Sequence, residues 1–393
     1  MAAAFCNTNL GSHHGLLFLN AFKRSSQFCH TPQQIFGKRQ LEVKRQRQCG
    51  QIFCESTSHY TTNANEGGKE EDIAKVTLVW RAIKLPIYSV ALVPLTVGGA
   101  AAYLHTGVFS ARRYFVLLAS SILIITWLNL SNDVYDFDTG ADKNKKESVV
   151  NLVGSRSGTL FAAYLSLALG FLGLTRTSLG AGNVQAILLL ACAVICGYIY
   201  QCPPFRLSYQ GLGEPLCFSA FGPFATTGFY LLLGSSSDMT YLPLTGTILS
   251  VSLLVGLTTS LILFCSHFHQ IEGDKAVGKI SPLVRLGTEK GSLVVKVAIV
   301  ALYSLLSIFV LSNALPFTCL LLCDLTIPMG NLVVRYVEEN HKDKGKIFMA
   351  KYYCVRLHAL FGAALAAGLV AARMLAERYP SKDNLFASII RYP

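Results

Sequence analysis

A cluster of oxygen-bearing side chains follows directly on an apolar segment of the sequence. The run 114–128 leads into Asn129, Asn132, Asp133, Asp136, Asp138 and Asp142, with Lys143 next. On a helix, Asn129, Asp133 and Asp136 would share one face, because residues three and four positions apart are neighbours. Such a face suits Mg²⁺, which binds proteins through one or two carboxylates and completes its shell with waters and substrate phosphates. The cluster therefore predicts a Mg²⁺ site with a basic side chain beside it.

A second cluster of acids comes much later, again at the end of an apolar run. Glu272 and Asp274 follow the run 243–266, and Lys275, Lys279 and Arg285 come after them. Two such sites on one side of a membrane could each hold a Mg²⁺ and bracket a diphosphate, with the basic side chains binding its remaining oxygens. The alternative is a solvated loop whose acids pair with nearby lysines. Because the pattern occurs twice, we favour the metal interpretation.

The composition indicates that both clusters belong to a membrane protein. Of the 393 residues, 52% are hydrophobic and only 14% are charged, whereas about a quarter are charged in a soluble domain. Nine apolar segments are long enough to cross a bilayer as helices of about 20 residues. Their expected ranges are 86–106, 113–132, 159–176, 183–202, 212–235, 243–266, 289–312, 315–336 and 354–376. The sequence therefore predicts an all-α polytopic bundle of about nine transmembrane helices.

The net charge of +12 is explained by topology and targeting. With nine spans, both acidic clusters lie on the side of the N-terminus, and most basic loop residues lie there too, as the positive-inside rule expects. Nucleic acid is not needed to explain the charge. Residues 1–65 are basic, hydroxylated and poor in acids, which is typical of an organellar transit peptide; a retained disordered tail is the alternative. We expect 66–85 to be an amphipathic segment leading into the membrane, 86–377 the nine-helix domain and 378–393 a C-terminal tail.

The two motifs resemble those of the UbiA superfamily of intramembrane aromatic prenyltransferases. The residues that carry the resemblance are Asn129, Asp133, Asp136, Gly140 and Asp142, then Asp274, Gly278, Lys279 and the run 283–287. They are most similar to the branch that prenylates 1,4-dihydroxy-2-naphthoate, and the resemblance covers residues 77–377. The sequence departs from the family at Gln270, where an aspartate is usual. Glu272 is our candidate substitute, although it would need a non-helical loop because positions 272 and 274 do not share a helical face.

The resemblance implies Mg²⁺-dependent transfer of a phytyl or other polyprenyl group from its diphosphate to 1,4-dihydroxy-2-naphthoate, inside a lipid bilayer. It implies catalytic roles for Asp133, Asp136 and Asp274; metal ligation by Asn129, Asp133, Asp136, Glu272 and Asp274; and diphosphate binding by Lys143, Arg206, Lys275, Lys279 and Arg285. Arg206 matches the basic motif between the fourth and fifth spans. Lys84 is a candidate for the acceptor's carboxylate. With the leader, the resemblance implies a multi-pass chloroplast membrane protein whose acidic motifs face the stroma.

Several alternatives stay open. Homogentisate or chlorophyllide could be the acceptor, with the same metal chemistry. A secondary transporter also has many spans, but its polar residues lie at the membrane midplane, whereas the ionisable residues here gather at span ends on one side. No general base is obvious, and Asp138, Asp142 and Glu214 are the possibilities. His267 and His269 would point in different directions on a helix, so we expect them to have satisfied hydrogen bonds or to line an aromatic site, and not to bind zinc.

Overall fold

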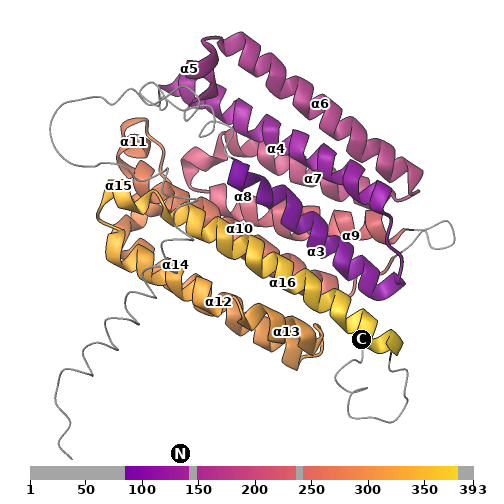
Figure 1. The fold of residues 1–393 in the computed structure, drawn as a ribbon. Helices are drawn as coiled ribbons and strands as arrows, with labels where there is room; N and C mark the ends of the chain where they lie inside the picture. The colour runs from indigo at the N-terminus through magenta and orange to yellow at the C-terminus, as the bar shows by residue number, and fades with distance from the viewer. Residues whose placement is uncertain (1–84, 141–147, 236–241, 379–393) are drawn as a thin grey trace, which may run out of the picture. The chain divides into compact units, whose positions relative to one another are not determined.

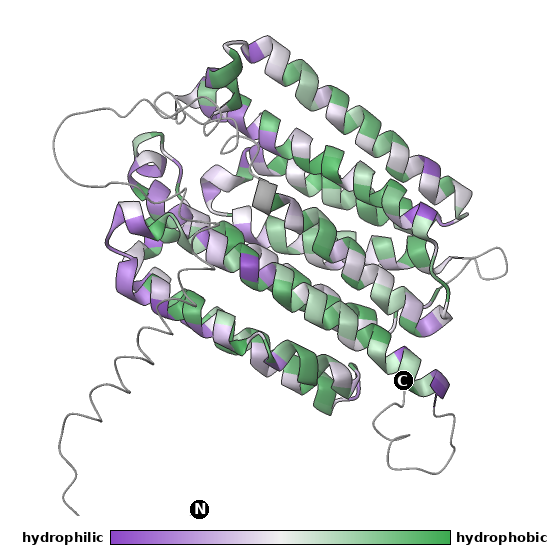
Figure 2. Ribbon diagram, viewed as in Figure 1, coloured by the Kyte–Doolittle hydropathy of each residue, from purple (hydrophilic) through white to green (hydrophobic). Residues whose placement is uncertain are grey.

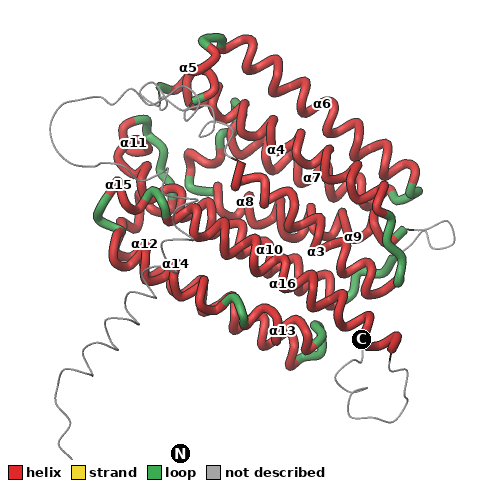
Figure 3. Tube along the Cα trace, in the orientation of Figure 1, coloured by secondary structure: helices red, strands yellow, loops and turns green. Residues whose placement is uncertain are grey.

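The computed structural model describes residues 85–140, 148–235 and 242–378, all of which fall within one compact unit. Every regular element in these ranges is a helix, and the ranges contain no strand (Figure 3). The expected all-α membrane bundle is therefore confirmed. The predicted leader, nearly all of the segment 66–85, and the predicted tail beyond 378 lie outside the described residues, as do Lys84, Asp142 and Lys143.

The chain runs back and forth through long helices joined by short turns (Figure 1). The longer helices are α3 (Ser89–Thr106), α4 (Ala111–Thr139), α6 (Arg156–Gly180), α7 (Val184–Gln201), α10 (Gly246–His267), α12 (Pro282–Leu311), α14 (Ile327–Asn340) and α16 (Ala350–Arg378). The shorter elements are η2 (Leu85–Tyr88), α5 (Val149–Val153), η3 (Leu207–Gln210), α8 (Gly213–Ser219), η4 (Ala220–Thr226), α9 (Thr227–Gly234), η5 (Phe268–Gln270), α11 (Ile271–Ala276), α13 (Phe317–Asp324) and α15 (Lys344–Ile347).

Eight helical segments in the described ranges are long and apolar enough to cross a bilayer, and there are nine if the pair α13 and α14, bent by 48°, is counted as one broken span. Two of the differences from the expected boundaries fall at the acidic clusters. Helix α4 continues to Thr139 instead of ending near 132, and the span that begins with α10 continues through η5 and α11 to Ala276. Both clusters therefore lie on helices. The non-helical loop that Glu272 would need is absent, since Glu272 and Asp274 both belong to α11.

Helix α3 lies between α9 and α16 in the packed interior. Close approach is possible because its facing residues are small: a Cβ at Gly98 would lie only 2.6 Å from the carbonyl oxygen of Thr226. Small residues at helix contacts are typical of membrane bundles, where close packing is the main stabilising force between helices. Large apolar side chains such as Phe161 and Leu188 point outward. Figure 2 shows hydrophilic residues gathered at the end of the bundle where α5, α11 and α15 lie.

One span is widened by a π-helical turn. Element η4 connects α8 to α9 and contains Pro223, which has no N–H to donate. The hydroxyl of Thr226 donates to the carbonyl of Phe221 over 2.7 Å. Turns of this kind occur frequently at functional sites. Here Phe221 and its neighbours Ala220 and Ala225 line the main cavity.

Candidate active site

A cavity of about 740 Å³ opens among α4, α7, η4, α10 and α16. Its polar residues come from the two predicted clusters and from the segment around η3, while Leu174, Leu190 and Phe229 belong to its apolar part. Along α7 its lining extends from Gln201 to Leu190, eleven positions apart, which corresponds to about 16 Å of helix at 1.5 Å per residue. The cavity thus has a polar part beside the acidic clusters and a deep apolar part within the bundle.

The first acidic cluster contributes Asn129, Asn132 and Asp136 to the cavity wall. The Asp136 carboxylate accepts a hydrogen bond from the Asn132 amide over 2.8 Å. Asp133, which is fully buried, is not part of the wall; its carboxylate accepts a hydrogen bond from the backbone N–H of Val149, the first residue of α5, over 3.1 Å. The three residues predicted to share one face therefore divide: Asn129 and Asp136 line the cavity, whereas Asp133 contacts the start of α5.

The second acidic cluster contributes Asp274 and Lys279. Asp274 is 6% exposed, and one of its oxygens lies 3.3 Å from the Lys279 ammonium group. The backbone N–H of Lys279 also donates to the Asp274 carbonyl over 2.8 Å, which closes the turn after α11. This arrangement holds a carboxylate and an ammonium group together at the cavity wall, with Gln270 beside them.

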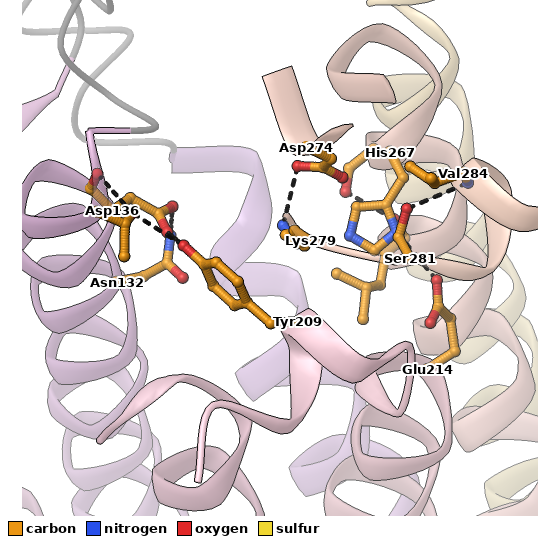
Figure 4. A network of polar contacts seen from close by, with 12 residues as sticks. Asn132, Asp136, Tyr209, Glu214, His267, Asp274, Lys279, Ser281 and Val284 are labelled. Carbon is orange, nitrogen blue, oxygen red and sulfur yellow. Dashed lines mark hydrogen bonds and ion pairs between the residues drawn. The ribbon is translucent and has the colours of Figure 1, made fainter. Parts of the chain in front are cut away.

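Tyr209 connects the two clusters (Figure 4). Its hydroxyl donates to Asp136 over 3.3 Å, and the Lys279 ammonium group lies 5.8 Å from the centre of its ring. The Tyr209 carbonyl accepts from the N–H of Ile280 over 2.8 Å. This approach requires glycine at 211, where φ is +83° and a Cβ would lie 2.7 Å from the Ile280 carbonyl oxygen. Tyr209 thus fixes the loop before α8 against the turn after α11.

Tyr209→Phe should lower turnover about tenfold, because it removes a hydrogen bond to a carboxylate while keeping the ring. Burial raises the pKa of Tyr209 to about 12, although its hydrogen bond with Thr139 opposes the rise. The hydroxyl therefore stays protonated, and the ratio of wild-type to variant rates should be constant from about pH 6 to about pH 9. Tyr198→Phe, on an exposed tyrosine outside the cavity lining, is the matched control. If Tyr209→Phe lost no more activity than Tyr198→Phe, the proposal that Tyr209 connects the two acidic clusters would be wrong.

The donors at the cavity suit a hard cation. One oxygen of Asp274 is buried without a hydrogen-bond partner among the described residues, and Asn129, Asn132 and Asp136 supply further oxygens. No group of three or more His, Cys, Asp or Glu side chains in the described ranges forms a closed metal site. Mg²⁺ is usually bound by one or two carboxylates and completed by water and substrate phosphates. The residues present therefore fit Mg²⁺ in an open site that a diphosphate would complete.

Several predicted site residues do not line this cavity. Glu272 is exposed, is not among the lining residues, and pairs over 2.7 Å with Lys344. Lys275 is exposed, and the exposed Arg285 donates to the Gln210 carbonyl over 2.7 Å. Arg206 lies 5.9 Å from the ring of Tyr135. The geometry thus supports Lys279 as a diphosphate ligand more strongly than these other cations.

Other residues of the site were not predicted. Tyr209 was not singled out, and no catalytic role was predicted for His267, which lines the cavity and lies 3.0 Å from Glu214. Asp138, a possible base, is instead held by Arg156 in two bonds of 2.6 Å. No local pattern marks these partners, because they are brought together only by the packing of distant segments.

Aromatic and basic side chains form another part of the cavity wall, at the start of α16. The Lys351 ammonium group lies 3.9 Å from the centre of the Phe348 ring, and the ring of His269 packs edge-on against Phe348 at 4.9 Å. All three residues line the cavity. A flat, negatively charged acceptor could pack against the rings of Phe348 and His269 and lie near the Lys351 ammonium group.

The fold and the cavity together define a class of protein: a membrane-embedded enzyme for a substrate with an anionic head and a long apolar chain. Residues 91–355 match the family profile described as the UbiA prenyltransferase family. The chain belongs to this family of prenyltransferases.

Two curated relatives are similar over most of the chain. The Arabidopsis thaliana protein named 2-carboxy-1,4-naphthoquinone phytyltransferase, chloroplastic, is 72% identical over 322 residues, covering 82% of this chain and 83% of that one. The Synechocystis protein named 2-carboxy-1,4-naphthoquinone phytyltransferase is 42% identical over 287 residues, covering 73% and 91%. Among solved structures, the apo UbiA homologue from Aeropyrum pernix K1 superimposes with a TM-score of 0.56 at 15% identity, covering 72% of this chain and 98% of that one. This last likeness supports the fold.

Proposed function

We propose that this prenyltransferase transfers a phytyl group from its diphosphate to 1,4-dihydroxy-2-naphthoate, with loss of CO₂ and diphosphate, in phylloquinone (vitamin K1) biosynthesis. The observation that carries the proposal is the 72% identity to a protein named as a naphthoquinone phytyltransferase, over four fifths of both chains. The 2-carboxy-1,4-naphthoquinone of that name is the oxidised form of 1,4-dihydroxy-2-naphthoate. We favour the reduced form as the acceptor, because an electron-rich ring is the nucleophile that an allylic cation requires.

The proposed site binds the diphosphate between the two acidic clusters. Asp136 and Asp274, with Asn129, are the proposed ligands of Mg²⁺, and Lys279 is the first candidate for the free diphosphate oxygens. Metal ligation by Asp133, which contacts Val149 outside the cavity wall, stays a prediction. Bound Mg²⁺ would stabilise the negative charge that develops as the carbon–oxygen bond to the diphosphate breaks. Direct roles for Lys143, Arg206, Lys275 and Arg285 stay predictions. Glu272 is omitted from the proposed ligands because of its exposed pairing with Lys344.

The rest of the cavity suits the other reactants. The phytyl chain would lie against Leu174, Leu190 and Phe229, where apolar walls keep water from the allylic cation. The aromatic acceptor would pack against Phe348, with Lys351 near its carboxylate. Lys84 stays a predicted alternative for that carboxylate. Attack by the ring carbon that bears the carboxyl group, followed by loss of CO₂, gives the prenylated hydroquinone.

We also propose a multi-pass chloroplast membrane location with both acidic clusters facing the stroma. The support is the word chloroplastic in the name of the Arabidopsis relative, the transit-like composition of 1–65, and the basic residues concentrated on the side of the clusters.

The test is product identity. Purified protein in lipid nanodiscs with Mg²⁺ and radiolabelled phytyl diphosphate would receive 1,4-dihydroxy-2-naphthoate, homogentisate or chlorophyllide in turn, under anaerobic reducing conditions. We expect a prenylated, decarboxylated product from the naphthoate alone. Preference for another acceptor would replace the proposed one, and substrate uptake into liposomes without any covalent product would favour a transporter.

A further inference from the structure

A buried carboxylate–imidazole pair lies beside the cavity, apart from the proposed metal ligands. The His267 Nδ1 atom is 3.0 Å from an Oε1 atom of Glu214, and the two side chains are only 3% and 14% exposed. His267 ends α10, and Glu214 lies in the first turn of α8. Of the two, His267 lines the cavity and Glu214 is not among the lining residues; Figure 4 shows the contact between them.

This pairing determines which nitrogen of His267 can accept a proton. An ionised carboxylate only accepts hydrogen bonds, so Nδ1 carries the hydrogen and donates it to Glu214. The lone pair of the neutral ring is then on Nε2. No hydrogen bond to Nε2 is found among the described residues, and the ring belongs to the cavity wall. The arrangement presents a basic nitrogen to a substrate, with an acid behind it to stabilise the protonated ring.

A buried carboxylate–imidazole pair contributes little to holding two helices together. Burying a carboxylate and an imidazole removes both from water, and an apolar pair of similar volume usually stabilises a fold as well or better. The second oxygen of Glu214 is also buried without a partner among the described residues. Buried charge pairs in a cavity are frequent at sites of proton transfer.

We propose that His267, oriented by Glu214, is the general base and then the general acid of the reaction. This inference rests on the proposed function, because it needs a hydroxylated aromatic acceptor. As the ring attacks, the O–H bond of the hydroxyl beside the carboxyl-bearing carbon breaks, and its proton passes to Nε2. The oxygen electron pair forms the ring carbonyl, and the ring carbon bonds to the first carbon of the prenyl cation. The diphosphate has left with the electron pair of its carbon–oxygen bond.

The second half of the reaction returns the proton. Prenylation at the carboxyl-bearing carbon creates a β-keto carboxylate, in which the carbon–carbon bond to CO₂ can break with its electrons passing into the carbonyl. The resulting enolate oxygen takes back the proton from Nε2 of His267. The ring is then aromatic again and His267 is neutral. No oxidant, reductant or further proton donor is needed.

The decisive experiment compares His267→Gln with wild type across pH, using the naphthoate acceptor and phytyl diphosphate. We expect kcat to fall about 10²- to 10⁴-fold near neutral pH, with little change in KM for the diphosphate. Phenolic hydroxyls ionise near pH 10, and an ionised acceptor needs no base. The deficit should therefore shrink about tenfold per pH unit between about pH 7 and about pH 9.

The other titratable residues in the cavity lining are Asp136, Cys196, Tyr200, Tyr209, Cys217, His269, Asp274, Lys279, Lys344, Lys351 and Tyr352. They are present in wild type and variant alike, so their direct effects cancel in the ratio. The matched control is His341→Gln, which removes a histidine bonded to Thr288 outside the cavity lining and should leave kcat within about threefold of wild type, as surface substitutions do.

A deficit that is the same at every pH would overturn the proposal, as would a His267→Gln rate within threefold of wild type. If His267→Gln fails to fold, Glu214→Gln carries the test: its amide oxygen can still accept from Nδ1, but the charge that stabilises the imidazolium is gone. The same pH-dependent deficit, smaller in size, is expected, and a pH-independent one would again overturn the assignment. Inactive wild-type protein would instead count against the proposed function.

Discussion

Asp274→Ala should reduce prenyl transfer by about 10³-fold or more, the cost of removing a group that stabilises charge in the transition state of an enclosed site. The Asp274 carboxylate is 6% exposed, carries an oxygen without a partner among the described residues, and is held beside Lys279. Its removal would take away a proposed metal ligand and leave the largely buried Lys279 ammonium group without its counter-ion. Asp136→Ala should have a similar effect from the other cluster. Labelled diphosphate released per minute is the measurement.

Glu272→Ala is the matched control. Glu272 lies two positions from Asp274 on the same short helix and has the same charge, but its carboxylate is exposed and paired with Lys344. Exposed ion pairs contribute little, so activity should stay within about threefold of wild type. If Glu272→Ala lost as much activity as Asp274→Ala, the division of roles within α11 would be wrong.

Metal dependence should separate the variants further. Chelation should abolish wild-type turnover, and added Mg²⁺ should restore it. Asp274→Asn should need a higher Mg²⁺ concentration for half-maximal rate, because an amide oxygen replaces a charged ligand. An unchanged Mg²⁺ dependence in Asp274→Asn would indicate that this residue acts through Lys279 instead of through the metal.

Val194→Trp should select against long prenyl chains. Val194 lines the cavity on α7 between its polar and apolar parts, so a large ring here would obstruct the deep part. Activity with phytyl diphosphate should fall about 100-fold, since even small displacements of a reacting group have effects of this size. With a short donor such as geranyl diphosphate, which needs less of the apolar part, the rate should stay near that of wild type with the same donor.

Leu188→Trp controls for the bulk of the new ring. Leu188 is on the same helix but is 60% exposed on the outer face, where a tryptophan would contact lipid. Leu188→Trp should therefore leave the rates with the long and the short donor nearly unchanged. If Val194→Trp lost equal activity with long and short donors, the substitution would be disturbing the packing of α7. The loss would then say nothing about where the prenyl chain lies.

Much of the fold could be predicted from the amino-acid sequence, because a bilayer requires each spanning helix to be a continuous apolar run, and such runs can be found without knowing the tertiary structure. Each spanning helix needs about 20 apolar residues, and charged side chains are confined to its ends. Nine such segments were therefore readable, including the one that the structure bends by 48° between α13 and α14. Asp136 and Asp274 were recognisable for the same reason, as acids at the ends of apolar runs.

The direction in which each acid points was decided only by the tertiary structure. Asp133 and Asp136 are three positions apart, about 60° around a helix, and both suited the predicted face. The packing of α5 against α4 engages Asp133 with Val149 and leaves Asp136 in the cavity. In the same way, the break between α10 and α11 buries Asp274 and exposes Glu272.

Partners from distant segments also depended on the folded chain. Tyr209 contacts Asp136 from 73 positions away, and Glu214 contacts His267 from 53. Such contacts are set by the turns and helix crossings that join the segments, and no local spacing encodes them. The sequence by itself thus determined the membrane bundle and the type of chemistry at its polar end. The tertiary structure selected which oxygens line the cavity and placed His267 in the cavity wall beside Glu214.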